Sequence, residues 1–250
     1  MGNEGQYVYC IIESNESRNF GPMGIGERGD VVTMINFNDL SAVCSKSPMT
    51  KYVINRENMT SHEKVIEKVM EDYTVLPVRF CTIAAGAEDI RTLLRRRHSE
   101  FKGLLRDMDN KVEMGLKGLW KDMNRIFHEI PEENKEVKKL KKKAEAKSGK
   151  SDIGQKIALG KAVKAALEAK KTAEGKQILN MFKRTAIDVK TNDVFGDSMF
   201  LNAVFLIDRT REKEFDYLVE DLAKKYDDRA TFKYVGPAPP FNFVNIVVKW

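Results

Sequence analysis

The chain reads Gly236-Pro237-Ala238-Pro239-Pro240-Phe241-Asn242-Phe243-Val244 near its carboxyl terminus. Adjacent prolines remove two backbone N–H donors and impose extended geometry on the residues before them. Phe241 and Phe243 then begin an alternating apolar run to Trp250, which is typical of a strand. The stretch predicts a rigid corner that leads into the last strand of a sheet. A simple change of chain direction needs only one proline or glycine. Three prolines and two aromatic residues therefore indicate a more particular surface, and we take Pro237, Pro239, Pro240, Phe241 and Phe243 as candidate partner-binding residues.

A second distinctive stretch, Val75-Leu76-Pro77-Val78-Arg79-Phe80, follows a helix that we expect to begin near Thr60. Thr60 and Glu63 have capping-box spacing, and the helix places His62 on its apolar face. Pro77 favours an edge position or a bulge in a strand over 75–82. Arg79 points away from Val78 and Phe80, so it is either solvated or paired with an acid such as Glu113 or Glu63.

The other apolar patterns predict an α+β protein. We expect strands over 7–13, 31–37, 40–45, 112–117, 199–208, 230–235 and 243–250, and helices over 87–106, 123–130, 153–184 and 215–226. Asn38-Asp39 is a hairpin signal, and Pro131 marks a helix end. This order predicts helices on one face of a mostly antiparallel sheet. We expect an N-terminal domain over 1–108 and a C-terminal domain over 109–250, both ferredoxin-like two-layer sandwiches.

Charge is concentrated in one part of the second domain. Residues 131–176 contain 14 Lys and 7 Asp or Glu, a net charge of +7, whereas the whole chain carries +6. The rest of the chain is therefore nearly neutral, and the basic pI belongs to a long helical Lys-rich insert over 131–185. We expect a mobile segment over 132–152 and a helix after it. The simplest interpretation of the basic segment is a solvated linker or a coiled-coil-like face, with polyanion binding as the alternative. Membrane-surface binding is disfavoured because the segment lacks a strong apolar face. Residues 131–176 contain no Arg, the residue favoured for bidentate phosphate or base contacts.

The sequence offers little material for catalysis. Gly24-Ile25-Gly26-Glu27-Arg28-Gly29 matches a dinucleotide fingerprint, but it leads into a strand pattern where that chemistry needs a helix. His62 and Glu63 point about 100° apart on a helix, so they do not converge on one atom. Cys10, Cys44 and Cys81 have no metal-ligand spacing and are typical of buried thiols in a reducing cytosol. We predict no enzyme activity, no cofactor and no metal.

Three phrases in order carry a resemblance to a known family: HEKVIEKVMEDYTVLPVRFCT from His62, LNAVFLI at 201–207 and YVGPAPPFNFV at 234–244. The chain resembles the gas vesicle accessory proteins of the GvpL/GvpF family over 6–120 and 186–250. The resemblance implies an N-terminal α+β domain and a modified ferredoxin-like C-terminal domain. Cys81 and Ala238 depart from the family pattern, which has Gly and often an aromatic residue at those places.

The resemblance implies a cytoplasmic accessory protein that helps to assemble the gas vesicle. Its expected partners are the apolar shell protein and other gas vesicle accessory proteins, with no nucleic acid and no membrane. His62, Glu63, Pro77, Arg79 and Phe80 complete the candidate partner-binding set. One rival is an RNA-binding ferredoxin-like module that uses Tyr7, Tyr9, Phe241, Phe243 and the basic insert. Another is an enzyme that uses the glycine-rich loop.

Overall fold

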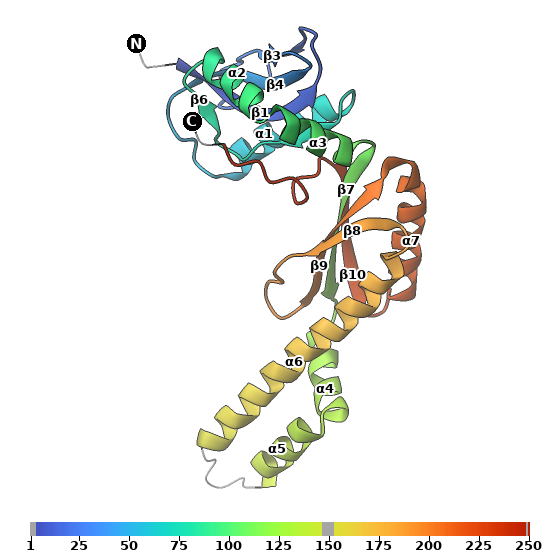
Figure 1. Cartoon of the computed structure of the whole chain (residues 1–250). Helices are drawn as coiled ribbons and strands as arrows, with labels where there is room; N and C mark the ends of the chain where they lie inside the picture. The colour runs from blue at the N-terminus through green and yellow to red at the C-terminus, as the bar shows by residue number, and fades with distance from the viewer. Residues whose placement is uncertain (1–3, 147–152, 249) are drawn as a thin grey trace. The chain divides into compact units, whose positions relative to one another are not determined.

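The structure is a computed structural model that describes residues 4–146, 153–248 and 250. Its contacts divide the chain into two compact units (Figure 1). Unit 1 comprises Met1–Glu113, Asp208–Thr210 and Pro237–Trp250, and unit 2 comprises Met114–Ile207 and Arg211–Gly236. Each unit has one sheet and its own helices, and the mixed α and β fold with antiparallel pairing is confirmed.

The sheet of unit 1 is built around the long apolar strand β1. It contains β1 (Glu4–Glu13), β2 (Asn19–Gly21), β3 (Val32–Phe37), β4 (Leu40–Pro48), β5 (Val75–Pro77) and β6 (Ile83–Ala84). The order is β2-β3-β4-β1-β5, and β6 also pairs with β1. The hairpin at Asn38-Asp39 is confirmed, with Phe37 opposite Leu40 and Asn38 at a φ of 53°. The edge position expected from Pro77 is also confirmed, because β5 ends this order.

Helices cover both faces of this sheet. α1 (Arg56–Met70) shares one core cluster with Tyr7 and Tyr9 of β1, whereas α2 (Ala87–Arg96) and α3 (His98–Met108) share another with Val8 and Ile11. The prediction of helices on one face was wrong, because β1 is apolar on both faces and both need cover. Four strands precede the first helix, so unit 1 also lacks the split βαβ order of the ferredoxin-like layer that we expected.

Local contacts shift three predicted element boundaries in unit 1. α1 begins at Arg56, because the Asn55 side chain accepts a hydrogen bond from the Asn58 N–H at 2.8 Å. The capping-box spacing at Thr60 therefore lies inside the helix. The expected strand over 75–82 is split by a turn in which Cys81 adopts a φ of 64°. The expected helix over 87–106 is two helices, separated at Arg97.

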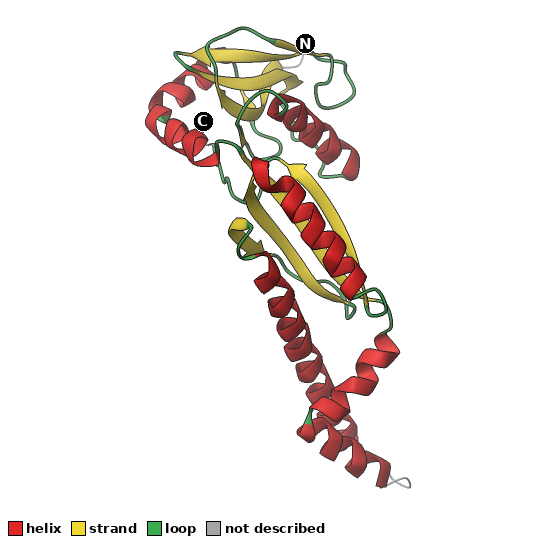
Figure 2. Cartoon of the chain, turned by 90° about the vertical axis from the view of Figure 1, so that its right-hand side faces the viewer, coloured by secondary structure: helices red, strands yellow, loops and turns green. Residues whose placement is uncertain are grey.

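Unit 2 contains a four-stranded sheet in the order β10-β7-β9-β8. Its strands are β7 (Lys111–Trp120), β8 (Ala186–Thr191), β9 (Met199–Asp208) and β10 (Ala230–Ala238). After a 3-10 turn over Arg209–Arg211, α7 (Glu212–Lys225) lies along one face of the sheet (Figure 2). The rings of Phe182, Phe205 and Phe215 pack within about 5 Å of one another beneath it.

The remaining helices of unit 2 are α4 (Met123–Glu133), α5 (Lys135–Ala146) and α6 (Ile153–Phe182). α6 confirms the helix expected from residue 153. The Asp122 carboxylate caps α4, which continues past the predicted stop at Pro131, a buried residue inside the helix. α5 corrects the prediction of a mobile segment over 132–152, because Val137 buries its side chain and is 1% exposed. Residues 147–152 of that prediction lie outside the described residues.

The carboxyl-terminal tail departs most from the sequence prediction. β10 ends at Ala238, and within the described residues 243–248 and 250 the expected strand is reduced to an isolated bridge between Ile246 and Val78. Val244 and Ile246 are buried in the core cluster of α2 and α3. The predicted boundary at 108/109 assigned the tail to the second domain. Its contacts instead group it with unit 1, because its apolar side chains complete that core.

Candidate partner-binding site

The two stretches that the sequence singled out lie side by side in unit 1. Val78 forms an isolated parallel bridge with Ile246, and the Arg79 Nε donates a hydrogen bond to the Asn245 Oδ1 at 3.1 Å. We call residues 75–82 and 239–248 the paired segments. Arg79 is exposed and contacts the tail through the amide of Asn245, whereas the sequence left open a solvated side chain or a pair with an acid such as Glu113 or Glu63. Tertiary contact has joined stretches that are far apart along the chain.

The proline corner forms a tight turn at the start of the tail. Pro239 and Pro240 are buried, whereas Pro237 is exposed on β10. The Pro240 carbonyl accepts hydrogen bonds from the N–H groups of Phe243, at 3.1 Å, and Val244, at 2.9 Å. Prolines lack N–H donors but keep their carbonyls, so they can be buried here without leaving a donor unsatisfied. The corner therefore fixes the direction in which the tail enters unit 1.

Glu113 anchors this turn from β7. Its side chain is buried, and its carboxylate accepts hydrogen bonds from the Asn242 backbone N–H at 2.8 Å and from the Asn242 Nδ2 at 2.5 Å. A buried carboxylate is costly unless donors satisfy it, and Asn242 supplies two. In the strand expected over 112–117, Glu113 alternates with the apolar residues Val112 and Met114, so the pattern favoured a solvent-facing Glu113. The alternation of the strand gave no sign that a tail residue would cover it.

His62 lies beneath the paired segments in a cluster of aromatic rings. The Tyr7 hydroxyl lies 3.0 Å from the His62 Nδ1, and the His62 ring stacks on Tyr9 and meets Phe80 edge-on. Burial lowers the pKa of His62 to about 4, and a hydrogen bond with the Val78 backbone acts weakly in the opposite direction. His62 is therefore neutral at ordinary pH, and its side chain is buried.

The Tyr7 hydroxyl links His62 to the paired segments. It accepts a hydrogen bond from the Cys81 N–H at 2.9 Å, at the turn where Cys81 has a positive φ. Burial raises the pKa of Tyr7, so the phenol stays protonated. Because the hydroxyl bonds both His62 and Cys81, the imidazole and the turn are held in one hydrogen-bonded unit. The position of Phe80 follows from this arrangement.

The remaining predicted site residues take different positions. Pro77 is buried in β5, and Phe241 packs half-buried against the aromatic cluster. Phe243 is half-buried, and Glu63 lies half-buried on α1, where burial and then Glu67 raise the pKa of its carboxyl group. The structure thus brings His62 and Phe80 together, with Phe241 packed against the same aromatic cluster, as a support. It leaves Pro237 and Arg79 on the surface.

Unit 1 also exposes large apolar side chains, which sequence reasoning missed. The loop between β4 and α1 exposes Met49, Val53 and Ile54, and the tail exposes Val247 and Trp250. We call these five residues the apolar rim. Met49 and Trp250 line one pocket of 300 Å³, together with Cys81 and Val248. The apolar pair Val53-Ile54 in a polar loop was the sequence signal available for it.

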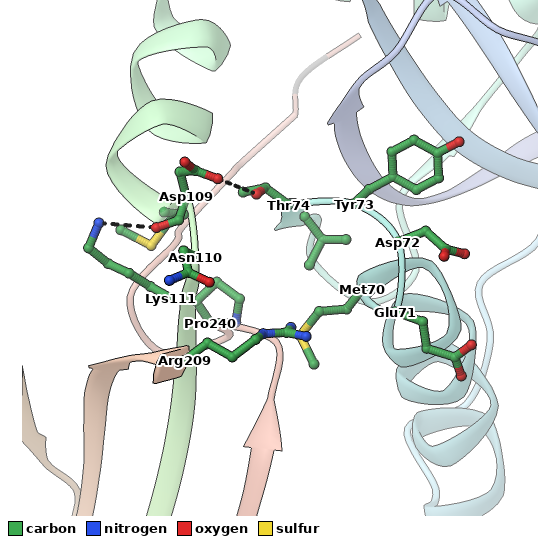
Figure 3. Close-up of a pocket in the computed structure, with 12 residues that line it drawn as sticks. Met70, Glu71, Asp72, Tyr73, Thr74, Asp109, Asn110, Lys111, Arg209 and Pro240 are labelled. Carbon is green, nitrogen blue, oxygen red and sulfur yellow. Dashed lines mark hydrogen bonds between the residues drawn. The ribbon is translucent and has the colours of Figure 1, made fainter. Parts of the chain in front are cut away.

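A second pocket of unit 1 is polar and partly closed by its own hydrogen bonds (Figure 3). It has a volume of 220 Å³ and is lined by acidic and basic side chains, with Pro240 of the proline corner among them. The Thr74 hydroxyl donates to the Asp109 Oδ1 at 3.2 Å, and the Lys111 Nζ donates to the Asp109 carbonyl at 3.4 Å. These contacts fix the turn after α3, so the pocket is better explained by local structure than by a ligand.

Among residues 4–146, 153–248 and 250, no three His, Cys, Asp or Glu side chains are grouped closely enough to hold a metal ion. Within the same ranges, no helix combines the length and apolar character needed to cross a membrane.

The fold defines a two-unit α+β protein in which the carboxyl-terminal tail completes the core of the first unit. The family model described as gas vesicle synthesis protein GvpL/GvpF matches residues 5–245, and the chain belongs to this family. It is 25% identical to gas vesicle protein F1 of Halobacterium salinarum over 246 residues, which cover 97% of this chain and 94% of that protein. It is 27% identical to gas vesicle protein F of a Streptomyces species over 239 residues, covering 95% and 98%.

A solved structure confirms the fold over nearly the whole chain. The crystal structure of the gas vesicle protein GvpF from an Anabaena species superposes with a TM-score of 0.82 at 23% identity. The superposition covers 98% of this chain and 100% of that one. The resemblance found from the three sequence phrases is therefore confirmed, and the chain is a gas vesicle protein by family.

Proposed function

We propose that this protein is an accessory factor of gas vesicle assembly that binds and covers the apolar shell protein before the shell forms. Its membership of the gas vesicle family supports the process, and its apolar rim supports the mode of action. It works by binding, with no cofactor and no chemical step. Its partners are the shell protein and other accessory proteins, and it acts in the cytoplasm and at the gas vesicle.

The observation that carries this proposal is the exposure of large apolar side chains on unit 1. Val53 and Ile54 are 70% and 80% exposed, and Trp250 is 51% exposed. Exposed large apolar side chains are typical of an interaction surface, and Met49 and Trp250 line one pocket. A subunit that must assemble later also exposes apolar surface, and covering it prevents aggregation. The two surfaces therefore have the same chemistry.

The tail favours a surface contact over strand addition as the mode of binding. Val78, next to the edge strand β5, is already bridged by Ile246 of the same chain. A partner strand at that position would have to displace the tail from a core in which Val244 is 5% exposed. The pocket lined by Met49 and Trp250 needs no such displacement. We therefore assign docking to the apolar rim and assign support to the paired segments.

We further infer that unit 2 is a modified ferredoxin-like domain. Its strand order β10-β7-β9-β8, with helices between β7 and β8 and between β9 and β10, matches the split βαβ arrangement. The modification is the set of three helices α4 to α6 in place of one. This arrangement supplies a frame and does not itself identify a ligand.

The burial of two tyrosines argues against the RNA-binding alternative. Tyr7 and Tyr9 are both 0% exposed beneath α1, so neither can stack on a base. Phe241 and Phe243 are only half-buried, but they pack at the proline corner and not on an open sheet face. Base stacking on a sheet requires exposed rings, so the observation that favoured this rival is removed.

Co-purification tests the proposal. Tagged protein is expressed with untagged shell protein, and the shell protein recovered with it is measured. We expect Val53→Asp/Ile54→Asp to reduce recovery by at least about tenfold, because a charged group on an apolar contact costs more than about 1.4 kcal/mol. Arg79→Ala tests the paired segments separately by removing the hydrogen bond to Asn245.

A matched control distinguishes specific binding at the apolar rim from nonspecific hydrophobic association. Phe195 and Tyr217 of unit 2 are 71% and 66% exposed, so Phe195→Asp/Tyr217→Asp removes similar apolar surface elsewhere. The control variant should recover the shell protein as the unchanged protein does. Equal loss in both double variants, or no loss in either, would refute docking at the apolar rim.

A further inference from the structure

The helices α5 and α6 form a strongly basic arm in unit 2. We define the arm as Lys135–Ala146 and residues 153–164, which together carry nine lysines and two glutamates. α5 packs against α6, and both helices extend beyond the sheet in Figures 1 and 2. Lys138 pairs with Glu132 at 2.7 Å. The exposed lysines are Lys135, Lys139, Lys141, Lys142, Lys143, Lys156, Lys161 and Lys164.

The exposed face of α6 has an ordered pattern as well as charge. Ile153 and Ile157 are 73% and 54% exposed. With about 100° per residue, Ile153, Ile157 and Lys164 fall within about 40° of one another, and Lys156 and Lys161 lie to either side. The face therefore consists of a short apolar strip with a lysine on each flank. Solvation alone would not require exposed isoleucines at this spacing.

The base of the arm is held by ion pairs, which makes the surface preorganised. Arg229 forms two hydrogen bonds of 2.8 Å with the Glu129 carboxylate of α4 and one of 2.5 Å with Glu174 of α6. Lys170 of α6 lies 2.7 Å from Glu133. These pairs tie α6 to α4, the helix that precedes α5, and so fix the end of α6 that lies next to the sheet. A fixed surface binds a partner with less loss of conformational freedom than a mobile one.

We propose that this face of α6, with the neighbouring lysines of α5, is a docking site for an acidic amphipathic helix of another protein. Such a helix places apolar side chains on Ile153 and Ile157 and carboxylates against the flanking lysines. The arm contains no Arg and no aromatic residue, so it lacks the groups that read or stack bases. Two isoleucines are too small an apolar face for insertion into a lipid surface.

Fluorescence anisotropy with a labelled synthetic peptide tests this assignment. The peptide is amphipathic, with leucines on one face and glutamates on both flanks, and a version with lysines in place of glutamates serves as the control ligand. We expect only the acidic peptide to bind, and its affinity to fall as salt is raised toward about 1 M. Lys156→Glu/Lys161→Glu/Lys164→Glu should weaken binding by at least about tenfold. Ile153→Ser/Ile157→Ser should weaken it by a smaller factor.

The control variant is Lys224→Glu/Lys225→Glu, which reverses two exposed lysines of α7 in the same unit. It should bind the acidic peptide as the unchanged protein does, and circular dichroism should show all variants folded. Equal binding by the α6 triple variant would overturn the proposal. Tighter binding of polyuridylate RNA, or of phosphatidylserine vesicles, than of the acidic peptide would overturn it in favour of that ligand.

Discussion

Unit 1 and unit 2 each fasten a distant segment with a titratable group, but they do so by opposite means. In unit 1 the imidazole of His62 is 3% exposed and joins neutral partners, and its pKa is lowered to about 4. In unit 2 Glu129 is partly exposed, and the Arg229 guanidinium lowers the pKa of its carboxyl group to about 2. Burial has suppressed the charge of His62, whereas the hydrogen bonds from Arg229 have preserved the charge of Glu129.

This difference follows from the cost of desolvation. A charge inside the aromatic cluster of unit 1 would have no counter-ion there, so the neutral form is retained. The cluster in unit 2 lines a pocket of 450 Å³ that leaves its charges in partial contact with water. Arg229 and Glu129 therefore keep their charges, and Arg229 ties α4 to α6 through its contacts with Glu129 and Glu174. The two units should differ in how they respond to mutation and to acid.

The largest effect is expected from Arg229→Ala. Removing the guanidinium leaves Glu129 and Glu174 near each other with their main counter-charge lost, although Lys170 stays close at 3.0 Å and 3.7 Å. We expect the free energy of unfolding to fall by about 3–4 kcal/mol. This value lies toward the lower end of the range for breaking a buried ion pair. Urea titration followed by far-ultraviolet circular dichroism measures it. A loss below about 1 kcal/mol would place the cluster among ordinary surface pairs.

The second effect is a pH dependence carried by His62. The pKa of its imidazole is about 4 in the folded protein, against an ordinary value of 6.5, so the unfolded state binds more protons between these limits. Stability is fully present above about pH 6.5 and falls as the pH drops toward about 4, by about 2–3 kcal/mol. His62→Gln, which does not titrate, should lose this part of the pH profile. An unchanged profile in that variant would assign the acid sensitivity elsewhere.

The same comparison predicts that the two units lose stability over different pH ranges as the pH is lowered. Glu129 contributes its full stabilisation above 4.5, the ordinary pKa of a glutamate carboxyl group, and loses it as the pH falls toward about 2. Unit 1 should therefore loosen first. Trp120 lies in unit 2 and donates to Glu174 at 2.8 Å, whereas Trp250 belongs to unit 1. Fluorescence of Trp120→Phe and Trp250→Phe variants follows each unit alone, and coincident acid transitions would contradict the prediction.

A smaller effect is expected where the tail meets unit 1. Glu113→Ala removes the acceptor of both Asn242 hydrogen bonds and should cost about 2 kcal/mol. The tail should also exchange its amide hydrogens faster, in particular that of Val244. Glu113→Gln keeps one side-chain acceptor and serves as the milder control. Equal exchange in the Ala variant and the unchanged protein would mean that the buried apolar contacts of the tail suffice.

The smallest effect is expected from Arg125→Ala. Arg125 also pairs with Glu129, at 3.3 Å, and with Asp228, at 3.1 Å, but its side chain is 47% exposed. Solvent screens such pairs, so the free energy of unfolding should not change beyond the error of a urea titration. Because Arg125 and Arg229 share one carboxylate, the two variants compare exposed and part-buried pairing directly. Similar losses of unfolding free energy in the two variants would refute the claim that burial determines how much an ion pair stabilises the protein.

Much of the fold could be predicted from local patterns. The run Met199–Asp208 is apolar enough to require a central strand, and Phe215, Val219 and Leu222 define the buried stripe of α7. The hairpin at Asn38-Asp39 followed from turn chemistry. The helix boundaries at Asn55 and Arg97 were missed, because weak signals compete at those places. Tertiary packing allows α4 to continue through Pro131, where local rules predicted a stop.

The candidate site was predictable only in part. The prolines and aromatics of the two stretches stand out by composition, and the structure places those stretches together. Which of these residues would be buried and which exposed was not predictable, because the burial of His62 depends on Tyr7, Tyr9 and Phe80 from other elements. Val53 and Ile54 could have been flagged as an apolar pair in a polar loop. Glu113 could not, because its neighbour Asn242 is far away in the sequence.

The sequence by itself determined which segments are apolar, which turns are tight, where lysines gather and to which family the chain belongs. These properties are set by neighbouring residues, whose spacing can be read along the chain. The tertiary structure alone decided that the tail completes unit 1, that His62 is neutral and internal, and that Arg229 joins two helices. Each of these depends on contacts between residues distant in sequence, and burial at such contacts governs both charge and packing.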